Sequence, residues 1–432
     1  MSAPGKADHA IQYNLLTIAI FLLMLVLMLT RPRGMHEAWA AVGGGLLMLL
    51  LGLETWQQAW TITVQGADVL AFLLALMLLS ALLDASGFFE WAAIQSARLA
   101  NGNGHALFRN VFLLGALITA FLSLDTTAII LTPIVLAFVS RLNLKPKPFL
   151  IACAFVANTG SLLLPVSNLT NLLFQSRFHF PFGAFALHML LPQIVAVVVN
   201  YAVLRWLFRK DLAADFSPDT LPDPASVVPD RVFFRAAVLV LAAILIGYFV
   251  GSLMHVPPYL VALAGCAVLL PLGLWRRRIE AKRLLHGISW PLFPFVVGLF
   301  VVVRGVENLG LASLAAHGLA RVGPSALAQV LVTGFGSGIG TNVVNNIPMA
   351  LLAISVLERG HASLPALYGS LLGCNIGPNL TIVGSLATML VLSSARQRGE
   401  DVRGADFFKV GLVATPLILL AACLALWATL RL

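Results

Sequence analysis

Apolar runs long enough to cross a lipid bilayer recur along the whole chain, and they limit what it can fold into. A helix needs about 20 mostly apolar residues to span the hydrocarbon layer. Charged residues make up only 10% of this 432-residue sequence. In lipid every backbone polar group needs an internal partner, which favours helices. We therefore predict an all-α polytopic membrane protein rather than a soluble one.

Ten runs have the length and composition of membrane spans. They cover residues 14–30, 38–53, 67–86, 149–175, 183–208, 233–252, 257–274, 289–306, 362–393 and 408–430. Arg31-Pro32-Arg33 follows the first run where a signal peptide would have small residues, so we interpret this run as a retained helix. Two longer stretches, about 107–140 and 326–357, are interrupted by polar residues and are expected to be re-entrant hairpins.

An internal repeat divides the chain into halves. Leu82–Arg98 aligns without a gap on Gly305–Arg321, and Ala157–Asn171 aligns on Cys374–Thr388. Each half has five spans, an odd number, so the second half should be inverted in the membrane, as in many secondary transporters. The expected domains are a first inverted repeat over 1–208, a cytoplasmic linker over 209–232 and a second inverted repeat over 233–432.

The formal net charge of +9 predicts an orientation rather than a nucleic-acid partner. Most lysines and arginines fall in loops on one side of the predicted membrane, and such an excess marks the cytoplasmic side. This places the linker in the cytoplasm and both termini outside it. We expect a multi-pass protein of the cell inner (plasma) membrane, with the lipid bilayer as its surroundings and no nucleic-acid partner.

Polar residues interrupt the apolar pattern at four equivalent places. The hairpins turn at Ser123–Thr127 and Gly340–Pro348, and two spans are broken within Ala157–Asn171 and Cys374–Thr388. A broken helix exposes backbone groups that need partners. We expect the four breaks to line a small hydrated cavity. The candidate substrate-binding residues there are Asn158, Thr159, Ser161, Asn345, Asn346, Asn375, Thr381 and Ser385.

Two interpretations of these polar residues stay open. Asparagine amides suit a neutral, hydroxyl-bearing solute, but they also join helices, and serine or threonine hydroxyls often bond to their own helix. Asp125 is the only one of the 18 acidic residues that we place deep in the membrane. An intramembrane carboxyl is costly unless it is protonated or paired, so Asp125 is the candidate proton-coupling residue. The alternative is a helix-capping aspartate at the hairpin tip.

Three motifs resemble the arsenite/antimonite efflux permeases, the ArsB family of the ion-transporter superfamily. They are "AIILTPIVLAF" (Ala128–Phe138), "NNIPMALL" (Asn345–Leu352) and "GCNIGPNLTIVGSLATML" (Gly373–Leu390). The resemblance implies export of As(OH)3 and Sb(OH)3 in exchange for protons. It also implies, for some members, a soluble arsenite-stimulated ATPase partner. The chain departs from the family pattern at Ser123-Leu124, Asn375 and Asn379. These changes remove charged residues from the site in the second half.

Other functions are weighed against proton-coupled export. The glycine-rich run Gly334–Gly340 has no strand context and no following Gly-Lys-Ser/Thr, so it predicts close helix approach rather than a nucleotide loop. We expect no enzyme activity, no cofactor and no metal site. The rivals are a carboxylate or Na+/H+ transporter of the same superfamily, and a passive membrane subunit of an ATPase-driven arsenite pump.

The four cysteines lie in apolar runs and are expected to be reduced packing residues. Thiol ligation of arsenic by Cys153 and Cys374 would hold the solute too tightly for release. Replacing all four cysteines by serine or alanine should therefore preserve arsenite transport, measured in proteoliposomes at matched protein content. Complete loss of transport with normal expression would instead support thiol ligation.

Overall fold

The computed structural model describes residues 4–217, 220–276, 278–280, 284–285 and 287–431. Within these ranges the chain is helical, and the only β-type pairing is an isolated bridge between Asn103 and Asp215. Nine helices of the described part are long and apolar enough to cross a membrane. A tenth candidate is a pair, α15 and α16, that bends by 69°. The prediction of an all-α polytopic membrane protein is confirmed.

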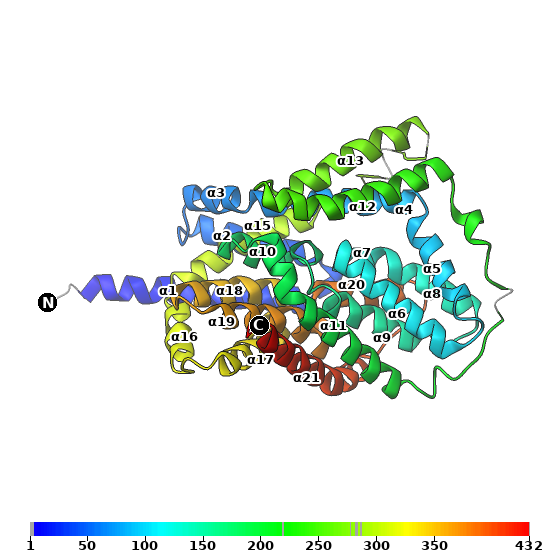
Figure 1. Ribbon diagram of the computed structural model, residues 1–432. Coiled ribbons are helices and arrows are strands. Elements are labelled where there is room, and N and C mark those ends of the chain that lie inside the picture. The colour runs from blue at the N-terminus through cyan, green and yellow to red at the C-terminus, as the bar shows by residue number, and fades with distance from the viewer. Residues whose placement is uncertain (1–3, 218–219, 277, 281–283, 286, 432) are drawn as a thin grey trace.

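The first half begins with helices that precede the predicted first hairpin in the chain. They are α1 (Pro4–Thr30), α2 (Glu37–Leu50), α3 (Trp56–Gln65), α4 (Ala67–Ala85) and α5 (Phe88–Arg98). Figure 1 shows α1 extending beyond the other helices on the side where α3 and α16 lie. The sequence pattern did not predict α3 and α5, because short helices of mixed polarity resemble loops between spans.

The stretches predicted as the first hairpin and the first broken span are both interrupted helices, and each arm of the hairpin is itself long and apolar enough to cross a membrane. The hairpin consists of α6 (Gly104–Phe121), α7 (Leu124–Thr126), the π-helical turn η2 (Thr127–Leu131) and α8 (Thr132–Arg141). The broken span consists of α9 (Pro146–Thr159), the short turn η3 (Pro165–Ser167) and α10 (Leu169–Phe178), followed by α11 (Phe182–Leu207). Pro165 explains part of the break, since proline supplies no backbone donor.

The second half repeats this order. It contains α12 (Arg231–Leu253), α13 (Pro258–Trp275), α15 (Leu292–Glu307), α16 (Leu311–Ala320), the hairpin α17 (Ala326–Val344) and α18 (Asn346–Arg359), the broken span α19 (Leu364–Ile376), η6 (Gly377–Leu380), η7 (Ile382–Gly384) and α20 (Leu386–Arg396), and finally α21 (Gly404–Thr429). The linker runs between α11 and α12. Its residues 218–219 lie outside the described residues. Its last residue before α12, Asp230, accepts hydrogen bonds from the amides of Phe233 and Val232, which lower the pKa of its carboxyl.

Corresponding elements of the two halves share their capping geometry. Gly87 precedes α5 with a φ of 81°, and Gly310 precedes α16 with a φ of 76°, a left-handed conformation that glycine adopts without strain. Asn168 caps the start of α10, and Ser385 caps the start of α20. These pairs match the alignment of the repeats. The inversion of the halves and the exact domain limits stay predictions.

The helices pack into two layers that meet at the hairpins. In one layer α2 packs on α15, α4 on α13 and α12 on α13. In the other, α17 packs on α19, α11 on α21, and α9 on α6 and α20. Figure 1 shows α12 and α13 along one edge of the molecule and α21 along the opposite edge. The second layer contains all four breaks, and we call it the core layer.

Glycines allow α17 and α19 to touch at their backbones. A Cβ atom on Gly373 would lie 2.1 Å from the carbonyl oxygen of Gly334, and one on Gly377 would lie 2.4 Å from the Cα of Gly338. These distances are shorter than van der Waals contact, so no side chain fits there. The glycine-rich run on α17 therefore serves close helix approach, as its sequence predicts.

Gly373→Ala should destabilise the protein by about 1–3 kcal/mol, because the added methyl group forces α17 and α19 apart. Gly336→Ala is the matched control, since a Cβ at Gly336 meets no atom within 4 Å. It should change stability by less than about 1 kcal/mol, with a gain favoured by helix propensity. Thermal unfolding in detergent measures both variants. Equal midpoints for the two would contradict the steric argument.

Candidate functional site

A network of buried amides joins the two broken spans. At its centre Asn375, in the last turn of α19, accepts hydrogen bonds from Asn168 Nδ2 at 2.5 Å and from Thr170 Oγ1 at 2.7 Å. Its own Nδ2 donates to Asn171 Oδ1 at 2.7 Å. All four side chains are buried. The first turn of α10 is therefore held by a residue of the other half of the chain.

A second set of bonds runs in the reverse direction, from α9 to the second half. Asn158, in the last turn of α9, donates from Nδ2 to Asn379 Oδ1 at 2.8 Å and to Thr388 Oγ1 at 3.1 Å. Asn379 in turn donates to the carbonyl oxygen of Phe155 at 3.2 Å. Asn158 and Asn375, which the repeat alignment pairs, thus each reach across to the opposite broken span.

The hydroxyl groups of the first break bond mainly to nearby backbone. Thr159 Oγ1 donates to the carbonyl oxygen of Phe155 at 2.8 Å and accepts from Asn200 Nδ2 at 2.7 Å. Ser161 Oγ donates to the carbonyl oxygen of Asn158 at 2.8 Å. Such local bonds are the usual role of serine and threonine in helices. Ser385 likewise caps α20, accepting from the amide of Ala387 at 3.2 Å.

The tip of the second hairpin is held against the second break by amides. Asn342 donates to the carbonyl oxygen of Gly377 at 2.9 Å and accepts from Thr381 Oγ1 at 2.7 Å. Asn345 donates to the carbonyl oxygen of Val383 at 2.9 Å. The backbone of Asn345 has a φ of 74° and a ψ of 159°, a region used almost only by glycine. Such strain costs about 1–3 kcal/mol and clusters at functional sites.

Three predicted asparagines retain a buried side-chain oxygen that no described residue satisfies. They are the Oδ1 atoms of Asn158, Asn345 and Asn346. Leaving a buried acceptor unpaired costs about 1–3 kcal/mol. All three atoms accept hydrogen bonds, so each of them has bonding capacity left for a donor, such as a hydroxyl group.

Asp125 lies at the tip of the first hairpin, partly buried in α7. Ser123 caps this turn, accepting from the amide of Thr126 at 3.1 Å, and the Thr126 hydroxyl also bonds to Ser80 of α4 at 2.7 Å. In the part of the chain that the structure describes, no lysine or arginine forms an ion pair with Asp125. The capping role proposed as an alternative for Asp125 falls to Ser123.

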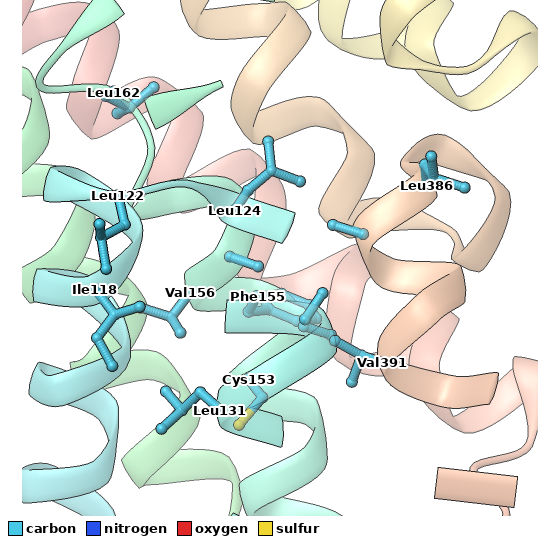
Figure 2. Close-up of a cluster of buried hydrophobic side chains, with 14 of the residues drawn as sticks. Ile118, Leu122, Leu124, Leu131, Cys153, Phe155, Val156, Leu162, Leu386 and Val391 are labelled. Atoms are coloured by element: carbon cyan, nitrogen blue, oxygen red, sulfur yellow. The ribbon is translucent and has the colours of Figure 1, made fainter. Parts of the chain in front are cut away.

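An apolar cluster surrounds the first hairpin tip. Figure 2 shows buried apolar side chains of one cluster that come from the first hairpin, from α9 and the segment after it, and from α20. The labelled residues are Ile118, Leu122, Leu124, Leu131, Cys153, Phe155, Val156, Leu162, Leu386 and Val391. Cys153 is one member, and all four cysteines are free and buried, as expected for packing residues. Leu124 places the carboxyl-bearing turn of Asp125 directly beside this cluster.

A larger cavity of about 460 Å³ lies away from the network, where α3, α4, α10, α15 and α18 meet. Two ion pairs line it: Arg177 with Glu358 at 2.7 Å and Arg304 with Glu307 at 3.1 Å. None of the predicted site residues is among its lining residues. Helix α10 is shared by both regions, since Leu173 lines the cavity and Asn171 belongs to the network.

Sequence analysis missed a second acidic residue beside a hairpin tip. Glu37, the first residue of α2, is only 4% exposed and lines a small cavity with Asn345. It was hidden because it follows Arg31–Arg33 at an apparent span boundary. The run predicted as a span over 38–53 forms only the 14-residue helix α2, which is shorter than the about 20 residues that a membrane span needs.

Comparison with known proteins gives one consistent family. The sequence profile described as "ArsB: Arsenical pump membrane protein" matches residues 16–430. An arsenical pump membrane protein of Escherichia coli is 33% identical over 427 residues, covering 95% of this chain and 98% of its own. A 46 kDa membrane protein of Mycobacterium leprae is 26% identical, covering 95% of this chain and 98% of its own.

Two solved structures share the fold. The YdaH transporter of Alcanivorax borkumensis superposes with a TM-score of 0.59 at 15% identity, covering 97% of this chain and 98% of its own. MtrF of Neisseria gonorrhoeae, described within a class of antimetabolite efflux pumps, superposes with a TM-score of 0.53 at 12% identity. It covers 95% of this chain and 94% of its own length. At these identities the likeness establishes the architecture alone.

The Asn168–Asn375 bond predicts strong coupling between the two broken spans. Asn168→Ala and Asn375→Ala should each destabilise the protein by about 1–3 kcal/mol, because each leaves a buried polar group unpaired. The double variant should lose clearly less than the sum of the two single losses. A double-mutant cycle by thermal unfolding in detergent measures the coupling. Strict additivity would mean that the bond contributes nothing.

Proposed function

Because this chain belongs to the ArsB family of arsenical pump membrane proteins, we propose that it exports trivalent arsenite and antimonite in exchange for protons. Family membership makes it a membrane transporter. The proposal adds the transported species, As(OH)3 and Sb(OH)3, and the coupling ion. It also assigns the protein to the cell inner membrane, with both termini outside the cytoplasm.

The unpaired asparagine oxygens are the observation that carries the proposed substrate. As(OH)3 is uncharged near neutral pH and presents three hydroxyl donors. Asn158, Asn345 and Asn346 each hold a buried acceptor without a partner, and no lysine or arginine joins the amide network among the described residues. A carboxylate substrate would need cationic groups there instead. The site therefore suits a neutral donor better than an anion.

The geometry supports a proton-coupling role for Asp125. The turn that bears it packs on α9, and η2, which follows directly in the chain, packs on α20, so this turn lies near both broken spans. A carboxyl group that faces no cation is inexpensive to bury only when it is protonated. Binding of a proton at Asp125 would thus favour the return of the core layer after solute release, as alternating access requires.

The rivals make different demands on the same scaffold. A sodium–proton exchanger needs the acidic residue but gives no role to the three unpaired asparagine oxygens. A passive pore driven by a soluble arsenite-stimulated ATPase needs no titratable group at the hairpin tip. An ATPase can still act as an additional partner of a proton-coupled exporter, and arsenite movement driven by a pH gradient without ATP would distinguish these cases.

Asp125→Asn should abolish arsenite transport driven by an imposed pH gradient in proteoliposomes, because asparagine cannot bind and release a proton. The variant should fold normally, since Asp125 makes no ion pair among the described residues. Glu90→Gln, at an exposed position in the first turn of α5, is the control and should transport like the wild type. Undiminished transport by Asp125→Asn would remove this residue from the mechanism.

A further inference from the structure

The cavity of about 460 Å³ lies between the two layers of helices. Helices α4 and α15, together with α3, form one wall, and α10 and α18 of the core layer form the other. Figure 1 shows α3 and α16 at one end of the molecule and the connection between α11 and α12 at the other. The proposed orientation puts that connection in the cytoplasm. The cavity reaches α3, so in this orientation it lies toward the outside.

The C-terminal ends of α10, α18 and α15 meet at one end of the cavity. Arg177 of α10 bonds to Glu358 of α18, with 2.7 Å between Nη2 and Oε2. Arg359 of α18 donates to the carbonyl oxygen of Glu307, the last residue of α15, at 3.1 Å. We call this charged end the mouth of the cavity.

The inner end of the cavity is apolar and lies close to the amide network. The lining residues Leu173 on α10, Leu351 on α18 and Phe300 on α15 precede the charged residues of the mouth by four to seven positions, about 6–10 Å along a helix. Leu173 follows Asn171 of the network by two residues, and Leu351 follows Asn346 by five, about 3 Å and 8 Å along their helices. Short segments of α10 and α18 therefore separate the cavity from the network.

The space at the other ends of α15 and α18 is much smaller. A cavity there, lined by Phe295 in the first turn of α15 and by Asn345 directly before α18, measures about 10 Å³. This volume holds one water-sized group at most. The two layers are thus close together at the tip of the second hairpin and apart at the mouth.

The charges of the larger cavity do not favour an anion. Each of the two arginines that line it forms an ion pair with one of its two glutamates. Asp68 adds a third carboxyl group, and a proton on His179 would only balance it. The described lining residues therefore give no excess of positive charge, which an anionic solute would need.

We propose that this cavity is the outer vestibule of the transport path, by which the neutral trihydroxide leaves the amide network toward the outside. The inference rests on the proposed function and deepens it by naming the exit route. The volume of about 460 Å³ lies within the range of about 300–1,000 Å³ that is usual for small-molecule pockets. Leu173 and Leu351 form the apolar barrier that closes the vestibule from the network in this conformation.

The test is the labelling of single added cysteines by a cationic, membrane-impermeant methanethiosulfonate reagent, applied to intact cells that express the full-length protein. Leu351→Cys, at the inner end of the vestibule, should react from the outside, because a thiol in water ionises and the thiolate is the reactive form. Wild-type protein gives the background, since its four cysteines are buried. Ser176→Cys, at an exposed position of the same cavity, is the second probe.

Val332→Cys is the matched control. Val332 is 50% exposed on α17 and is not among the residues that line the cavity. It follows Ser325, which caps α17, by seven residues, just as Leu351 precedes Glu358 by seven, so both lie about 10 Å from a helix end. A thiol that faces lipid stays neutral, so Val332→Cys should react at least about tenfold more slowly than Leu351→Cys.

Arsenite export by the labelled cells shows whether the vestibule is on the path. The attached group occupies the vestibule, so Leu351→Cys should lose most of its own export after labelling. Export by Val332→Cys should be the same before and after the reagent is added. The measurement is the arsenite retained by cells that have no other arsenite exporter.

The outcomes separate this inference from the proposed function. If cells with the wild-type protein export no arsenite, the proposed function fails, and this inference fails with it. If they do export it, but Leu351→Cys or, where that variant does not fold, Ser176→Cys reacts no faster than Val332→Cys, only the vestibule is overturned. Unchanged export after labelling would also overturn it, since the solute would then leave by another route. Labelling only from the cytoplasmic side of inverted vesicles would overturn the exit direction, and the inference with it.

Discussion

Helices that stop inside a membrane protein leave backbone groups without partners, and the rest of this structure depends on how they are satisfied. The breaks after Thr159 and Ile376 leave carbonyls and amides without helical partners in the buried interior of the protein. Asparagine is the usual solution here, because one side chain supplies both donors and an acceptor. The side-chain amides of Asn158 and Asn375 each donate a hydrogen bond to a residue in the opposite half of the chain.

These hydrogen bonds explain how the core layer is held together while some of its acceptors have no partner. The donors of the network are largely used between the broken spans, which fixes their relative positions. Some acceptors are left over at Asn158, Asn345 and Asn346. A solute that brings hydroxyl groups would complete the network rather than disrupt it. In the proposed function, the same set of hydrogen bonds would hold the site together and bind the solute.

Sequence alone could predict the parts that are set by local pattern. The four interruptions of the helices follow from polar residues, glycines and prolines placed within apolar runs. The partners within the network could not be predicted, because Asn168 and Asn375 are far apart in the chain and any of several amides could have met. Glu37 was missed for a similar reason, since its burial depends on how the α1–α2 turn meets the second hairpin. The larger cavity likewise depends on the spacing of five separate helices.

The backbone contact between α17 and α19 has a consequence for motion. Gly334 and Gly338 meet Gly373 and Gly377, so sliding of one helix along the other would press side chains of the same face, such as Ser337, against the opposite backbone. Sliding is thus sterically blocked along this pair. If the second hairpin moves during the proposed transport, this contact predicts that α19 moves with it.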